Sequence, residues 1–153
     1  MKLNLTPAER TALRRAKRKQ ADLAQADPVE VARELSCTPR RARELVGLAT
    51  FQSINSLGPG FARDLIEMDI FSLDDLRGRT GADLLDEHER RLGYTTDPCV
   101  EDQFRRVVHY AHTGDNSLSW FDFTAERKAH RTEHGYPADR PTVAWHEVLL
   151  AKD

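Results

Sequence analysis

Residues 54–65 read INSLGPGFARDL, which places Gly58-Pro59-Gly60 between two apolar stretches. Glycine and proline together interrupt regular structure, and proline is favoured at the first position of a helix. We therefore predict a helix end near Leu57, a tight turn, and a second helix that begins at Pro59. Ala62 is expected to lie packed between the two helices. A turn of this kind directs backbone N–H groups outward at a helix N-terminus, which favours an anion such as phosphate.

The segments on both sides of this turn also predict helices. Thr6-Pro7-Ala8-Glu9 has the pattern of a capping box with proline at the first helical position, which predicts a helix to about Gln25. Further helix starts are expected at residues that can cap a helix: Asp27, Thr38, Ser72, Thr80, Asp97 and Thr124. The tail from Tyr136 is expected to be extended, and 142–150 is the one stretch that could pair as a strand. The fold class predicted from these patterns is all-α.

Composition and charge limit the classes of function. No apolar run approaches the roughly 18 residues that a membrane helix needs, and the N-terminus lacks the apolar core of a signal peptide. Two cysteines, Cys37 and Cys99, do not form a disulfide framework. We therefore expect a cytoplasmic protein with no membrane partner. Residues 1–46 carry 11 Lys/Arg against 6 Asp/Glu, whereas the remainder carries 12 against 19. This asymmetry indicates a polar partner for the basic front, or contact between the two ends.

The turn and its surroundings resemble a known family. Residues 54–62 are similar to the helix-hairpin-helix consensus, in which hydrophobic and glycine positions lead into a helix with a close-packed alanine. The longer stretch 48–123, from LATFQSINSLGPG to LSWFDF, resembles the bacterial pathogenicity locus family of small helix-hairpin-helix proteins. The resemblance implies a compact bundle of short helices with tandem helix-hairpin-helix (SAM-like) motifs and an expectation of DNA binding. It implies no reaction.

The resemblance and the helix starts together suggest four segments. They are a basic N-terminal helix (1–26), a degenerate first helix-hairpin-helix or helix-turn-helix-like pair (27–50), the helix-hairpin-helix domain (51–123), and a C-terminal helix with an extended tail (124–153).

Three positions depart from the family pattern. Ser56 stands where the first glycine is usual, Gly60 where a lysine or another polar residue is frequent, and Asp69 where a glycine commonly follows the second helix. Carboxylates also crowd the region, with Arg63 and Arg77 as the nearby cations. By charge the turn is a poor clamp for phosphate, so a turn kept for packing and a turn that contacts DNA both remain open.

The basic front offers more cations. Arg14, Lys17 and Arg18 would share one face of the first predicted helix, and Arg40, Arg41 and Arg43 follow the Thr38-Pro39 start. Arginines in the first turns of a helix stand beside its N–H groups, as on a recognition helix. The candidate nucleic-acid-binding residues are therefore Arg14, Arg15, Lys17, Arg18, Arg40, Arg41, Ser56, Gly58, Gly60 and Arg63.

Other chemistry finds little support in the sequence. His109 and His112, and likewise His130 and His134, have spacings that suit two metal ligands on one helical face, and Cys99 could join them. No cysteine pair accompanies them, and surface or capping histidines are the ordinary explanation, so we expect no metal and no cofactor. Cys99 follows a proline at a helix start, a place that lowers the pKa of a thiol. No nucleophile elbow, P-loop or dinucleotide fingerprint occurs, which predicts a protein that is not an enzyme.

Two functions follow as hypotheses. The first is a small non-enzymatic helix-hairpin-helix protein that binds DNA weakly and without sequence preference, because contact through backbone and phosphate reads no bases. The alternative is a module for protein–protein interaction or self-association, in which the acidic rear meets a basic surface of another protein or of a second copy.

Overall fold

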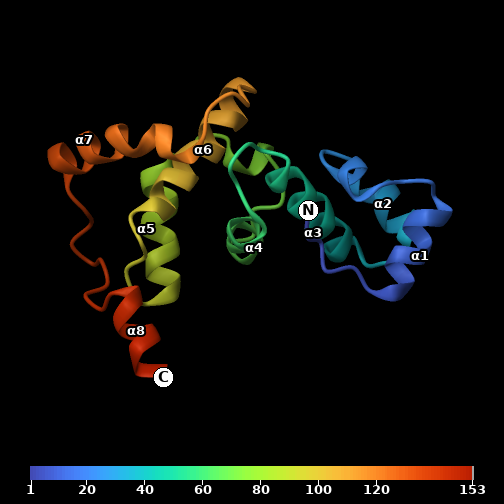
Figure 1. Ribbon diagram of the computed structural model, residues 1–153, viewed down its shortest axis with the longest axis horizontal. Helices are drawn as coiled ribbons and strands as arrows, with labels where there is room; N and C mark the ends of the chain where they lie inside the picture. Colours follow the sequence, from blue (N-terminus) through green and yellow to red (C-terminus); the bar gives the residue numbers. More distant parts are fainter. Residues whose placement is uncertain (153) are drawn as a thin grey trace. The chain divides into compact units, whose positions relative to one another are not determined.

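The structure is a computed structural model that describes residues 1–152, with side chains to residue 150 (Figure 1). The α-helices are α1 (Pro7–Arg15), α2 (Pro28–Leu35), α3 (Pro39–Gln52), α4 (Pro59–Glu67), α5 (Gly81–Leu92), α6 (Cys99–Thr113), α7 (Thr124–His134) and α8 (Trp145–Lys152). The short 3-10 helices are η1 (Gln20–Leu23), η2 (Asp74–Leu76) and η3 (Trp120–Phe123). The predicted all-α class is confirmed. No helix within residues 1–152 is long and apolar enough to cross a bilayer.

The chain divides into two units, Met1–Arg77 and Gly78–Asp153. This division falls inside the segment 51–123 that the sequence suggests as one domain, and the four suggested segments stay predictions. In the first unit α3 is the central helix, and it packs against η1, α2 and α4. Gly47 on α3 allows α4 and Phe71 to pack closely against this helix, because a Cβ at residue 47 would lie 2.8 Å from Ile66 Cδ1 and from the Phe71 carbonyl oxygen. Ala62 on α4 is fully buried, as predicted.

Three of the predicted helix starts, those of α1, α3 and α5, are set by threonine side chains that accept backbone N–H groups one turn ahead. Thr6 and Glu9 form the capping box, with Glu9 N–H donating to Thr6 Oγ1 at 3.1 Å and Thr6 N–H donating to Glu9 Oε2 at 3.0 Å. Thr38 and Thr80 each accept from the N–H three residues later. The start at Pro59 also lies where the sequence predicts it, but α3 ends at Gln52, five residues before the end predicted near Leu57, and residues 53–58 form the connection.

The first helix is shorter than predicted. α1 ends at Arg15 instead of continuing to Gln25, because Lys17 adopts the left-handed conformation with φ of 57°. Lys17 N–H donates to the Arg14 carbonyl and Arg18 N–H donates to the Leu13 carbonyl, both at 3.0 Å. These two bonds close the helix as a Schellman motif, a stop that is usually made by glycine. The sequence has no glycine here, so its composition gives no sign of the stop.

The second unit is built around α5 and α6. Their facing sides bury apolar residues such as Leu84, Leu85, Phe104 and Val107. Gly81 lies at the crossing of the two helices, where a Cβ would stand 2.5 Å from Arg105 Cγ and 2.8 Å from Arg105 Cα. The close approach of the two backbones therefore depends on the absence of a side chain at residue 81.

Buried ion pairs attach α7 to α6. No residue of α7 is buried, so apolar contact does not hold it. Arg131 Nε donates to Glu101 Oε1 at 2.8 Å, and Arg127 Nε donates to Asp102 Oδ1 at 2.7 Å. Both carboxylate side chains are completely inaccessible to solvent. Ion pairs therefore hold α7, the polar helix that the sequence predicts from Thr124, against α6.

The tail beyond α7 contains a helix that the sequence analysis missed. Residues 145–152 form α8 rather than the extended structure predicted for the tail. Before α8, Thr95 and Ala144 form a single parallel bridge, in which Trp145 N–H donates to the Thr95 carbonyl at 2.7 Å. Ala144 N–H donates to Glu147 Oε2 at 3.0 Å, so a side chain one turn ahead supports the start of α8.

Candidate nucleic-acid interface

The predicted cations at the end of α1 are exposed. Arg14 and Arg15 lie in the last turn of α1, and neither has a carboxylate within ion-pair distance in the part of the chain that the structure describes. Lys17 is also exposed, but its left-handed backbone lies beyond the helix. The expectation that Arg14, Lys17 and Arg18 share one helical face is therefore wrong, because the helix ends before the last two.

Arg18 is turned toward α2 instead of solvent. Its Nε donates to Glu34 Oε2 at 2.6 Å, and its Nη2 lies 3.6 Å from Glu30 Oε2. The two carboxylates neutralise the guanidinium and fasten the segment after α1 to α2. Contact of Arg18 with a phosphate would have to break these pairs.

Arg40 and Arg41 are also matched by carboxylates within the first unit. Arg41 binds Glu9 through two nitrogens, at 2.9 and 3.0 Å, and donates to the Asn4 carbonyl at 3.1 Å. The hydrogen bond from Arg41 lowers the pKa of the buried Glu9 carboxyl, against the opposing effect of its burial. Arg40 lies 3.2 Å from Asp69. Arg41 therefore stabilises the unit, whereas the Arg40 side chain is 62% exposed and its ion pair with Asp69 lies at the surface.

The turn between α3 and α4 presents backbone rather than side chains. Leu57 N–H donates to the Ile54 carbonyl at 3.1 Å, and both of these side chains are buried, which anchors the turn. Ser56, Gly58 and Gly60 are exposed, and a Cβ added at either glycine would meet no atom within 4 Å. Ser56 has φ of 70°, the left-handed conformation that glycine adopts most easily.

The charges beside the turn are mixed. Arg63 is exposed on α4, and it lines a small pocket of about 210 Å³ together with Arg41, Glu44 and Glu67. The structure thus brings Arg41 and Arg63 to one pocket, whose lining also includes the carboxylates of Glu44 and Glu67. Asp64, the next residue on α4, is half-buried, and burial together with the Glu67 carboxylate raises its pKa from 3.8 to about 6 against the effect of Arg63.

Asp64 predicts a stability that decreases as the pH rises. Its folded-state pKa lies above its unfolded-state value, so ionisation disfavours the folded protein, and the loss develops between about pH 4 and pH 6. We expect Asp64→Asn to raise the free energy of unfolding by about 1–2 kcal/mol at pH 7 and to leave it nearly unchanged at pH 4. Urea unfolding of both proteins at the two pH values measures this. A gain of equal size at pH 4 and pH 7 would show that the carboxylate is not the cause.

Phe71 is a residue of this region for which the sequence predicts no part in binding. The Arg43 guanidinium carbon lies 4.3 Å from the centroid of the Phe71 ring, and that of Arg40 lies 5.3 Å from it. No carboxylate of the described chain pairs with Arg43, although it belongs to the same arginine run as Arg40 and Arg41. The run itself was visible in the sequence, but nothing in it distinguished the unpaired arginine from its two neighbours.

The histidines and Cys99 form no cluster suited to a metal ion within the described residues. The rings of His130 and His134 lie tilted at 45° with centroids 4.7 Å apart, and His109 packs against Phe123. Cys99 differs from expectation, because burial and the neighbouring Asp97 raise the pKa of its thiol. These two effects outweigh the lowering of the thiol pKa that is expected at a helix start.

Comparison with known proteins gives one match. The family model described as pathogenicity locus, Cdd1, matches residues 44–129, which is more than half of the chain. The matched range begins inside α3 and ends inside α7, and it includes the turn before α4. It confirms the family resemblance of residues 48–123. No curated protein and no solved structure matches the chain.

Proposed function

The chain belongs to the pathogenicity locus family, and we propose from that premise that it is a non-enzymatic helix-hairpin-helix protein that binds DNA weakly and without sequence preference. The observation that carries the proposal is the exposed pair Arg14 and Arg15, which has no carboxylate partner in the described chain. Unpaired surface cations attract phosphate by releasing the counterions of the nucleic acid, and they do so irrespective of sequence.

The backbone around α4 supports the assignment of α3, the turn and α4 as a helix-hairpin-helix. Ser56 and Asp69 stand where the consensus has glycine, and their φ angles are 70° and 60°. A left-handed conformation is the reason why glycine is favoured at such places. The fully buried Ala62 corresponds to the close-packed alanine of the consensus.

The ion pairs of the first unit restrict where DNA would bind. Arg18, Arg40 and Arg41 are matched by carboxylates, whereas Arg14, Arg15 and Lys17 are exposed. We therefore place the main phosphate contacts at the end of α1. The turn, with Ser56, Gly58, Gly60 and Arg63, would add at most a weak contact, because Asp64, Glu67 and Asp69 lie close to it in sequence on α4 and just beyond it.

Neutralising the end of α1 is expected to weaken DNA binding. We predict that Arg14→Gln with Arg15→Gln lowers the affinity for a short duplex and reduces the slope of log K against log salt by about 1–2, since about 0.9 is lost per phosphate contact. Fluorescence anisotropy with duplex and single-stranded DNA at two salt concentrations measures this. The matched control is Arg90→Gln with Lys128→Gln, which removes two exposed charges from the second unit and should leave the slope unchanged.

Two results would contradict the placement. If Arg63→Ala abolishes binding and the α1 variant does not, the turn is the phosphate clamp. If the native protein binds neither form of DNA at low salt, the DNA-binding proposal fails. Cations in the last turn of a helix also stabilise it by about 0.3–1 kcal/mol, so the melting temperature of the α1 variant is measured in parallel.

The internal pairing of three predicted cations favours a second candidate function. With Arg18, Arg40 and Arg41 neutralised, the first unit offers fewer cations to DNA than its sequence suggests. A protein that instead mediates contacts with another protein or with a second copy would show concentration-dependent association in sedimentation velocity and no salt-dependent affinity for DNA.

A further inference from the structure

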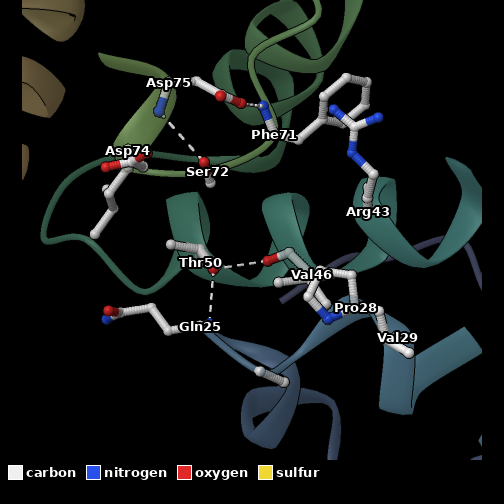
Figure 2. A pocket seen from close by; sticks show the side chains of 12 residues that line it. Gln25, Pro28, Val29, Arg43, Val46, Thr50, Phe71, Ser72, Asp74 and Asp75 are labelled. Atoms are coloured by element: carbon white, nitrogen blue, oxygen red, sulfur yellow. Dashed lines mark hydrogen bonds between the residues drawn. The ribbon is translucent and has the colours of Figure 1, made fainter. Parts of the chain in front are cut away.

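A cleft of about 560 Å³ opens in the first unit between the start of α2, one face of α3, and residues 71–75 (Figure 2). Its walls are mixed, with an apolar part that includes Pro28, Val46 and Leu73. Val29 stands at this cleft with 64% of its surface exposed. Apart from Met1, it is the one large apolar residue exposed within residues 1–77. Clefts of this volume that combine apolar walls with polar groups are typical of sites for small molecules.

Most polar groups of the cleft are already bonded within the chain. Thr50 Oγ1 donates to the Val46 carbonyl at 2.7 Å and accepts from Gln25 N–H at 2.8 Å, as Figure 2 shows. Asp75 Oδ2 accepts from Phe71 N–H at 2.9 Å. Asp74 forms an ion pair with Arg77. The hydrogen bonds of Thr50 and Asp75 shape the cleft, whereas the pair of Asp74 with Arg77 is largely exposed.

Arg43 is different. Its side chain rises from α3 beside Phe71 at the edge of the cleft (Figure 2). The ring of Phe71, 4.3 Å from the guanidinium carbon, supports the planar group, and no carboxylate of the described residues pairs with it. A guanidinium held by an aromatic ring keeps its N–H donors at its edge, where they can bind a carboxylate through two parallel hydrogen bonds.

We propose that this cleft binds a small apolar monocarboxylate, with the apolar body against Val46, Leu73 and Val29 and the carboxylate on Arg43. A single negative charge matches the single unpaired cation of the cleft. A phosphate monoester carries up to two charges, so Asp74 and Asp75, which line the same cleft, would repel it more strongly than they repel a monocarboxylate. A cationic ligand would find Asp74 already paired with Arg77. This proposal is independent of DNA binding.

The test is an NMR titration of the full-length ¹⁵N-labelled protein with 3-phenylpropionate, its amide 3-phenylpropionamide, and phenyl phosphate. We expect saturable shifts of the amide signals of Arg43, Val46 and Leu73 with the carboxylate. The amide compound, which has the same apolar body and no charge, should bind at least about fivefold more weakly. Phenyl phosphate should also bind more weakly than the carboxylate.

Two variants identify the cation. Arg43→Gln should weaken carboxylate binding by about fivefold and remove the difference between acid and amide. The matched control Arg33→Gln, at an exposed arginine of α2 outside the cleft, should change neither. Equal binding of acid and amide to the native protein, tighter binding of phenyl phosphate, or no saturable shift at these three amides would each overturn the proposal. The comparison of acid with amide in the native protein does not depend on how well Arg43→Gln folds.

Discussion

Replacing Glu101 by alanine is expected to lower the free energy of unfolding by about 3–5 kcal/mol, the cost of removing one partner from buried ion pairs. The Glu101 side chain is completely buried and accepts from Arg131 Nε at 2.8 Å and from Arg105 Nη2 at 2.8 Å. Both arginines are themselves at most one-tenth exposed. Removal of the carboxylate leaves Arg131 with Asp86 and Arg105 with the exposed Glu126 as their remaining carboxylate partners, and it removes one of the two buried ion pairs that hold α7 on α6.

The measurement is urea unfolding followed by tryptophan fluorescence. Both tryptophans of the chain, Trp120 and Trp145, lie in the second unit, so this signal reports the unit in which the change is made. Glu126→Ala is the matched control, because Glu126 contacts the same Arg105 at 3.3 Å but is 61% exposed. Exposed pairs contribute about 0–1 kcal/mol, so the control should change little. Equal effects of the two variants would show that burial of the pair does not matter.

Gly81→Ala is expected to lower the free energy of unfolding by about 2–3 kcal/mol through overpacking. The new Cβ would lie 2.5 Å from Arg105 Cγ and 2.8 Å from both Cα and N of Arg105. The flexible Cγ could move, but the backbone atoms belong to the middle of α6 and can move only if the whole helix shifts. The effect runs against helix propensity, since alanine is ordinarily better than glycine in a helix by about 1 kcal/mol.

Gly60→Ala provides the comparison. Gly60 also lies in the first turn of a helix, and a Cβ there would have no atom within 4 Å. The same substitution should therefore be neutral or slightly stabilising at residue 60, because only the propensity term remains. Unfolding followed by circular dichroism covers both units. A Gly81→Ala protein as stable as the native one would show that α5 and α6 do not depend on this close approach.

Predictions from the sequence succeeded where the deciding contacts are local. Thr6, Thr38 and Thr80 cap their helices through a bond to a residue three positions later, and Pro59 begins α4 directly after Gly58. The predictions failed where a helix ends in a way that its residue types do not reveal. The end of α1 uses Lys17 in a conformation that glycine usually supplies, so the helix was drawn about ten residues too long.

The candidate site could be predicted in part. The turn at residues 56–60 and the exposed Arg14 and Arg15 follow from residue type and position. The sequence does not reveal that Arg43 is unpaired, because Arg43 lies in the same run as Arg40 and Arg41. Which of the three is left without a carboxylate depends on where Glu9 and Asp69 arrive in the folded unit.

The sequence by itself determined the all-α class, the starts of the first five α-helices and the turn before α4, because capping bonds and proline act within one helical turn of the residue that carries them. Only the tertiary structure decided which charges remain for a partner. Arg18 meets Glu34 at a separation of 16 residues, Arg41 meets Glu9 at 32, and Arg131 meets Glu101 at 30. An ion pair requires two groups within about 4 Å, and for residues so far apart along the chain that distance is set by the packing of whole helices.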